Sequence, residues 1–328
     1  MNARLFQRRF VVVTGKGGVG RSTICAALGL AAARSGLQTC ILQMTTRDAI
    51  GRHFNRSVVG YDPVQLGPDL PLFCSILNPK DALREYGLMK LRFRSLHRVV
   101  FENDVMRRLL NMVPGMTEML LLGKAWHMEA EEADDTGKPR WDLLIVDAPA
   151  TGHGISLLRL PEVILEAVSV GPMAEDARKM QAMLSDPKRT SLNIVTLPQE
   201  LATNEALELA DMSQRLTGAP VGYLFVNSLL PDLFDDQERQ AVASMLQDGD
   251  NPLVRSCAES VEHYLHLRAQ QRVQLQRLRE SSHLPVIELE HHLKELDRDA
   301  IEHMAATCVE AMASADRDEH NESAPVPS

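Results

Sequence analysis

One stretch near the amino terminus, VVVTGKGGVGRST at residues 11–23, restricts the fold more than any other part of the sequence. The apolar, β-branched run over residues 10–14 predicts a buried strand, and the alanine-rich segment over residues 22–35 predicts a helix. Glycines at positions 15, 17, 18 and 20 let successive backbone N–H groups point at one anion, and the helix start adds its positive end. Strand, glycine turn and helix in this order predict a phosphate-binding loop in an α/β protein.

Several residues of this loop are predicted to hold a phosphorylated ligand. They are Gly15, Lys16, Gly17, Gly18, Val19, Gly20, Arg21, Ser22 and Thr23. The Ser22 hydroxyl is expected to ligate Mg²⁺, and Thr23 to reach another phosphate oxygen. Arg21 stands where the pattern G-x4-G-K-[ST] has lysine; arginine keeps the charge but is longer and fork-shaped. We therefore expect phosphate binding to be retained and phosphoryl transfer to be weakened. The alternative is a glycine-rich turn without a ligand.

A second motif, DAPATGHG, follows the apolar run WDLLIVD at residues 141–147. This run predicts a buried strand, so Asp147 would lie at the carboxyl end of that strand. Ligands of open α/β sheets bind at this edge, and we expect Asp147 to hold Mg²⁺ through a water molecule. The alternative is an aspartate that only caps the next helix.

Composition narrows the class of protein. The 328 residues are 45% hydrophobic and 24% charged, and the net charge of −9 argues against broad nucleic-acid binding. No apolar run is long enough for a transmembrane helix, so no transmembrane segment is expected. The five cysteines are scattered and form no C-x-x-C, which argues against a zinc site or a disulfide framework. We expect a cytoplasmic location.

Strands and helices are predicted to alternate along the chain. Further strands are expected over residues 39–44, 71–77, 163–170, 192–197, 221–227 and 285–289. A helix is predicted to open at Pro79, residues 129–139 to form an acidic, solvated loop, and residues 255–281 to form one long helix. Such alternation predicts a mostly parallel sheet covered by helices on both faces.

A lysine directly after the first glycine, as in GKGG, marks a deviant Walker A loop. With this loop, DAPATGHG, ILNPKDALREY and LFVNSLLP, the sequence resembles the ArsA/Get-type ATPases, which are related to MinD and ParA. The resemblance covers residues 8–295 and implies a P-loop NTPase domain that binds ATP and Mg²⁺. It also implies a helical subdomain over residues 81–132, inserted before the switch II segment. A C-terminal helix is expected over residues 296–313, followed by a disordered tail over residues 314–328.

The resemblance also implies roles for single residues. In this family the lysine at the position of Lys16 reaches across a dimer to the partner's nucleotide, where its charge assists catalysis. Asn227 would bind the adenine edge, although a turn residue at a strand end is the alternative. A protein client or partner is expected on the helical subdomain, because methionines suit an adaptable apolar groove; core filling is the alternative. The six methionines concerned are Met89, Met106, Met112, Met116, Met119 and Met128.

Two departures from the family pattern concern catalysis and cargo. Where the family has S-T-D-P-A-H, this chain has QMTTRD, so Thr45 takes the place of the aspartate that positions water. A hydroxyl cannot act as a carboxylate base at neutral pH, and Asp48 is the candidate catalytic substitute. Neither the metalloid-binding cysteines nor the zinc C-x-x-C of the family can be matched. We therefore expect no arsenite transport and no zinc.

Three functional hypotheses follow. The first is an ATP-driven dimeric switch for a protein partner, with slow hydrolysis because of Arg21 and Thr45. The second is a non-hydrolysing ATP-binding subunit of a heterodimer with an intact ArsA-like paralogue. The third is a MinD/ParA-like polarity or partitioning ATPase, which the acidic, proline-containing carboxyl end does not favour.

Overall fold

The computed structural model describes most of the chain. The described residues are 3–45, 47–56, 59–90, 116–133, 137–168, 170–248, 251–293 and 295–322. Part of the predicted helical subdomain (91–115), with Met106 and Met112, lies outside them, as do residues 134–136 of the acidic loop and the last residues, 323–328.

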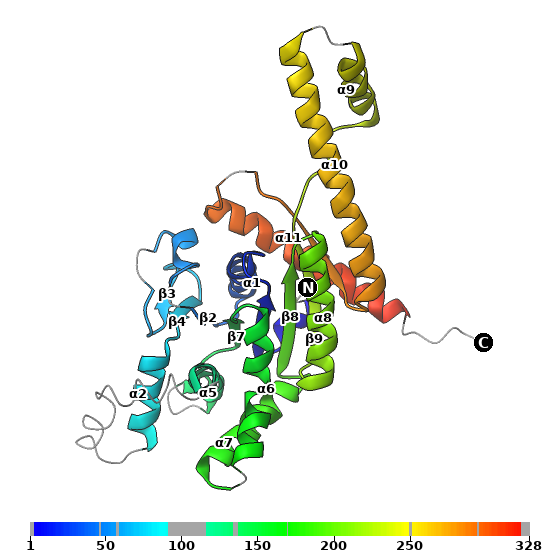
Figure 1. Ribbon diagram of the computed structural model, residues 1–328. Coiled ribbons are helices and arrows are strands. Elements are labelled where there is room, and N and C mark those ends of the chain that lie inside the picture. Colours follow the sequence, from blue (N-terminus) through cyan, green and yellow to red (C-terminus); the bar gives the residue numbers. More distant parts are fainter. Residues whose placement is uncertain are drawn as a thin grey trace.

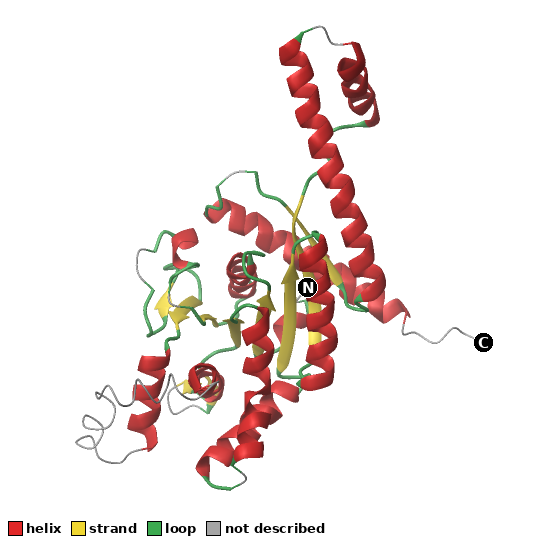
Figure 2. Ribbon diagram, viewed as in Figure 1, coloured by secondary structure: helices red, strands yellow, loops and turns green. Residues whose placement is uncertain are grey.

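The centre of the molecule is an eight-stranded sheet in the order β10-β9-β8-β1-β7-β2-β4-β3 (yellow in Figure 2). Its strands are β1 (Phe10–Gly15), β2 (Thr39–Gln43), β3 (Val64–Gln65), β4 (Leu72–Ile76), β7 (Leu143–Asp147), β8 (Thr190–Thr196), β9 (Val221–Leu229) and β10 (Val286–Glu290). Pairing is parallel throughout the described sheet except between the short β3 and β4. The mostly parallel α/β fold predicted from the sequence is confirmed.

Alternate side chains of the central strands enter different cores. Val11 and Val13 of β1 face the layer of α1 (Arg21–Arg34) and α11 (Arg298–Glu322), whereas Val12 faces the opposite helical layer. Those opposite helices are α5 (Met116–Ala130), α6 (Thr151–Ala167), α7 (Pro172–Ser185), α8 (Glu200–Leu216) and the inner part of α10 (Pro252–Ser281). Because both faces of this parallel sheet are buried, its central strands are mostly apolar, and polar residues such as Asn193 of β8 are buried among them. Figure 1 shows α1 and α11 on one side of the sheet and α6 and α8 on the other.

The remaining elements lie around this core. They are η1 (Arg4–Gln7), η2 (Gly51–Phe54), α2 (Pro79–Lys90), the hairpin of β5 (Glu132–Ala133) and β6 (Lys138–Pro139), and α9 (Asp236–Asp248). Helix α2 packs on α5. Helix α9 packs on α10, and this second pair projects away from the body of the molecule (Figure 1). Among the described residues, no helix is both long and apolar enough to cross a membrane.

The strand predicted over residues 163–170 is wrong. Most of that segment belongs to α6, whose Leu157, Leu160 and Ile164 are buried at helical spacing. Val163 of the same helix is exposed by 47%, as expected when the period is 3.6 residues rather than two. The proline at position 161 lies inside the helix, which made the sequence resemble a break followed by a strand.

The acidic loop predicted over residues 129–139 needs correction, because residues 129 and 130 end α5 and Glu132–Ala133 pairs with Lys138–Pro139 in the β5–β6 hairpin. Glu129 is only 1% exposed and lies in α5. Its carboxylate lies 2.6 Å from Nη2 of Arg189 and 3.6 Å from Nε of Arg9. A buried carboxylate is tolerated when cations and hydrogen bonds compensate it, and these two arginines come from distant parts of the chain.

The predicted tail is also shorter than expected, because α11 continues to Glu322. Asp316, within the segment expected to be disordered, accepts a 2.8 Å hydrogen bond from the backbone N–H of Arg4 and another from the Tyr223 hydroxyl. These long-range bonds hold a polar helix end that its composition alone would leave unstructured.

Candidate nucleotide site

The predicted phosphate loop lies between β1 and α1, at the carboxyl edge of the sheet. Gly15 admits no side chain, because a Cβ atom there would lie 2.1 Å from the backbone oxygen of Val195. Gly20 has a φ of +92°, and a Cβ atom there would lie 2.2 Å from the side-chain nitrogen of Asn227. That nitrogen donates a 2.9 Å hydrogen bond to the backbone oxygen of the buried Val19. The loop is thus fixed by its neighbours on β8 and β9.

The hydroxyl of Ser22 and the carboxylate of Asp147 contact each other beside this loop. The hydroxyl of Ser22, at the start of α1, donates a 2.5 Å hydrogen bond to Oδ2 of Asp147, at the end of β7. Asp147 is 5% exposed, and this burial raises the pKa of its carboxyl, although Ser22 and Arg21 act in the opposite direction. Two hard oxygen ligands with an incompletely compensated buried charge fit Mg²⁺.

Arg21 links the phosphate loop to the segment after β7. Its Nη1 donates a hydrogen bond to the carbonyl oxygen of Ala148, the residue that follows Asp147. Arginine is long enough to reach this carbonyl and forked enough to keep other N–H groups for a second acceptor. The guanidinium therefore ties α1 to the segment between β7 and α6.

Lys16 is held by an acidic residue of the same chain. Its Nζ lies 2.6 Å from Oε1 of Glu205 on α8, and each side chain is 33% exposed. The pair lies at the surface of the phosphate loop, so Glu205 competes for the Lys16 ammonium with any anion that approaches it. Nothing in the spacing around Glu205 signalled this partner from the sequence.

A cleft of about 660 Å³ opens beside the loop. Gly18, Ser228 at the end of β9, and His291 after β10 line it together with the first turn of α8 and one face of α10. Asn227 lies next to this cleft and is 8% exposed; its Oδ1 accepts a hydrogen bond from the Ser228 N–H. The adenine contact expected of Asn227 remains a prediction.

A family model described as "Anion-transporting ATPase" matches residues 8–171, which is half of the chain. The chain belongs to the ArsA-type ATPase family. Three relatives illustrate this. ATPase BagA of Mycobacterium tuberculosis is 25% identical over 259 residues, covering 76% of this chain and 73% of BagA. ATPase GET3C of Arabidopsis thaliana is 26% identical over 277 residues, covering 70% and 69%. The arsenical pump-driving ATPase of Escherichia coli is 27% identical over 256 residues, covering 72% and 42%.

In this ATPase of the ArsA family, the predicted switch I residues Thr45 and Asp48 lie in the segment after β2. Oδ1 of Asp48, the candidate catalytic residue, accepts hydrogen bonds from Nε2 of Gln43 and from the N–H groups of Ile50 and Gly51, at 2.9 to 3.0 Å. The Thr45 hydroxyl accepts a 3.3 Å bond from the Arg47 N–H. These contacts give Asp48 a structural task at the start of η2.

The structure thus brings the predicted phosphate-loop residues together with Asp147, whereas the Asp48 carboxylate is bonded to the turn at η2. Lys16, Arg21, Ser22 and Asp147 all lie at the loop and its immediate neighbours, and Thr23 is buried in the first turn of α1. In the described part of the chain, no cluster of three or more His, Cys, Asp or Glu side chains could hold a metal ion.

Proposed function

We propose that this ATPase is a nucleotide-dependent switch for a protein partner, working as a dimer with ATP and Mg²⁺. The observation that carries the proposal is the pair of bonds from α1 to the start of switch II: Ser22 to Asp147, and Arg21 to the Ala148 carbonyl. Bound Mg²⁺ would be held by Ser22 and, through water, by Asp147, and would neutralise phosphate charge. A ligand in the phosphate loop therefore acts on the residues from which α6 begins.

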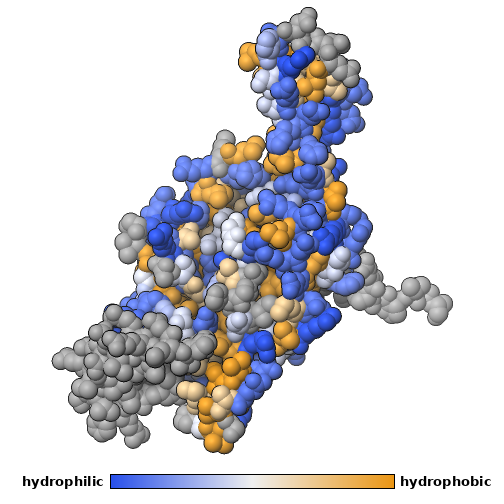
Figure 3. All heavy atoms as spheres, viewed as in Figure 1, coloured by the Kyte–Doolittle hydropathy of each residue, from blue (hydrophilic) through white to orange (hydrophobic). Residues whose placement is uncertain are grey.

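Helix α6 offers a route from the phosphate loop to a partner surface. It begins at Thr151, close after Ala148, and packs on α5 and α7. Its Ile164 lines an apolar cavity of about 250 Å³ together with Met119, Trp126 and other residues of α2, α5 and α7. Hydrophobic side chains also gather over α6 and α7 at the lower end of Figure 3. A displacement of α6 would change this surface, which suits an apolar protein segment.

The cysteines support a cargo other than a metalloid. Cys25, Cys40, Cys74 and Cys308 are buried, and burial raises the pKa of each thiol, in Cys308 to about 12. A protonated, buried thiol is a poor ligand for a soft ion. Cys257 is exposed but lies on α10, apart from the other four.

The Lys16–Glu205 pair gives a first test of dimer formation. If Lys16 serves the nucleotide of a second subunit, Glu205→Gln removes a competing partner. We expect the ATP-dependent dimer to tighten by up to about fivefold, because an exposed ion pair contributes little. Sedimentation with ATP and Mg²⁺ measures this, with Glu208→Gln, an exposed residue of the same helix, as the control. Weaker dimerisation of the Glu205 variant alone would contradict the role in trans.

Slow hydrolysis is tested by restoring the family's residues. The double variant Arg21→Lys, Thr45→Asp is expected to turn ATP over about tenfold faster or more, because one preorganised charged group at the transition state has effects of this order. Steady-state phosphate release measures the rate, with Arg47→Lys, an exposed neighbour of Thr45, as the control. An unchanged rate in the double variant would mean that Arg21 and Thr45 do not limit hydrolysis.

A second candidate function is a non-hydrolysing ATP-binding subunit that pairs with an intact paralogue. The engagement of Asp48 with the η2 turn favours it, since its Oδ1 already accepts three hydrogen bonds from the protein. Steady hydrolysis by this chain alone, abolished by Lys16→Ala, would exclude this candidate.

A further inference from the structure

The long helix α10 extends well beyond the nucleotide edge of the sheet. Gln271 marks the level at which β9 ends: its side chain accepts a 2.8 Å hydrogen bond from the Leu230 N–H and donates a 3.2 Å bond to the Ser228 carbonyl. The segment Pro252–Leu267 lies beyond this level, and at 1.5 Å per residue it extends for about 24 Å. Together with α9 it forms a projecting helical hairpin, at the top of Figure 1. We call Asp236–Asp248 and Pro252–Leu267 the arm.

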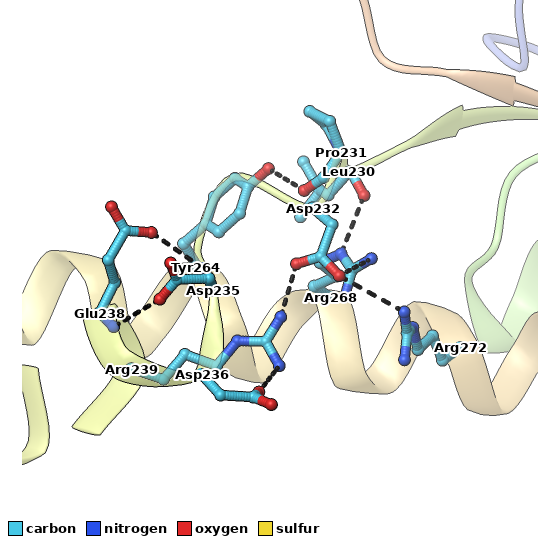
Figure 4. A network of polar contacts seen from close by, with 10 residues as sticks. All are labelled: Leu230, Pro231, Asp232, Asp235, Asp236, Glu238, Arg239, Tyr264, Arg268 and Arg272. Atoms are coloured by element: carbon cyan, nitrogen blue, oxygen red, sulfur yellow. Dashed lines mark hydrogen bonds and ion pairs between the residues drawn. The ribbon is translucent and has the colours of Figure 1, made fainter.

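The arm is firmly fixed at its base. Asp232, between β9 and α9, accepts a 2.6 Å bond from Nη2 of Arg239 and lies 2.9 Å from Nη2 of Arg268 and 3.6 Å from Nη2 of Arg272 (Figure 4). These arginines hold the pKa of the Asp232 carboxyl below its usual range. The Tyr264 hydroxyl donates a 2.8 Å bond to the Pro231 carbonyl beside them. Such a network fixes the direction in which the arm projects.

The arm buries almost nothing of its own. Among its described residues only Ala258 is buried, whereas Met245, Leu253 and Leu267 are exposed by 46%, 72% and 39%. Two helices without a shared core gain little from packing on each other. Toward the body of the molecule, the same face of α10 continues from Leu267 and lines the cleft that also contains Gly18 of the phosphate loop. The exposed arm and the nucleotide cleft therefore form one continuous surface.

Charge indicates what this surface meets. The arm contains five acidic residues, Asp236, Glu238, Asp248, Glu259 and Glu262, against two arginines. At the same edge of the sheet, but on the far side of β1, the segment after β2 carries three exposed arginines: Arg47, Arg52 and Arg56. Two arms lying side by side would repel each other, whereas an arm over this basic segment is electrostatically complementary.

We propose that the arm clasps a second copy of this chain, crossing over residues 47–56 of that copy when the two nucleotide edges face each other. A subunit that docks on this edge must lie beside an arm projecting about 24 Å past it. Two-fold symmetry then forms the contact twice, arm on basic segment in both directions. The inference rests on the proposed nucleotide-dependent dimer and adds to it the surface that holds the two subunits together.

The native Cys257 allows a direct test, because it is exposed on the arm and the other four cysteines are buried. The full chain is labelled there with benzophenone maleimide and illuminated with Mg²⁺ and a non-hydrolysable ATP analogue, and without nucleotide. Sedimentation of the labelled protein reports whether the dimer forms. We expect a nucleotide-dependent crosslinked product of twice the chain mass, with the crosslink mapped to residues 47–56. A dimer without this crosslink would overturn the arm's role, whereas absence of a dimer would overturn the proposed function and the arm's role with it.

Charge reversal provides a second measurement. Glu259→Arg with Glu262→Arg is expected to weaken the nucleotide-dependent dimer about tenfold or more, and Arg52→Glu with Arg56→Glu in the same chain to restore it. Glu310→Arg, at an exposed position of α11, is the control and should leave dimerisation unchanged. Equal dimerisation by the arm variant and the control would contradict the proposal. Because these positions are exposed, the variants are expected to fold.

Discussion

Replacing Asp147 with asparagine is expected to abolish the Mg²⁺-dependent part of stabilisation by ATP. Asparagine keeps the shape of the side chain but removes the negative charge that would hold the ion next to Ser22. At a ligand concentration about 100 times its dissociation constant, the lost stabilisation would be about 2.7 kcal/mol. Without nucleotide the variant should unfold at no lower temperature, because burial disfavours the charged carboxylate that is removed. Thermal unfolding with ATP, with and without Mg²⁺, measures both effects.

A matched control lies next to the start of the same strand. Asp142 is exposed, and its Oδ2 accepts a hydrogen bond from the Gln38 N–H, away from the carboxyl edge. Asp142→Asn should leave the Mg²⁺ response intact. If the Asp147 variant also retains the full response, Asp147 has no part in binding the ion, and the proposed switch loses the observation that carries it.

The second large effect concerns folding. Gly15→Ala is expected to destabilise the protein by about 3 kcal/mol or more, because the new Cβ atom would meet the backbone oxygen of Val195 in the centre of the sheet. Backbone in a parallel ladder cannot move away as a flexible side chain can. Denaturant unfolding without nucleotide measures the change in the free energy of unfolding.

Gly17→Ala is the control for this prediction. A Cβ atom at Gly17 has no heavy atom within 4 Å, so we expect the free energy of unfolding to stay within about 1 kcal/mol of the native value. Equal stability of both variants would show that the loop does not depend on close contact between Gly15 and β8.

The fold was largely predictable because its main signals are local. The apolar runs of β1 and β7 could be recognised without their neighbours, since a strand buried on both faces reads as a nearly continuous apolar run. Prediction failed at α6, where a proline and β-branched residues imitate a break and a strand although the buried leucines follow helical spacing. It also failed at Glu129, whose burial depends on Arg9 and Arg189, far away in the sequence.

Within the candidate site, the sequence by itself determined the glycine turn between β1 and α1 and the position of Asp147 at the end of β7, because glycine spacing and a strand end are properties of short segments. Only the tertiary structure decided which groups face one another: Lys16 with Glu205, Arg21 with the Ala148 carbonyl, and Gln271 with the end of β9. It also decided that the long helix predicted over residues 255–281 projects past the nucleotide edge. Contacts between distant segments depend on how the whole chain packs, and neither periodicity nor composition records that arrangement.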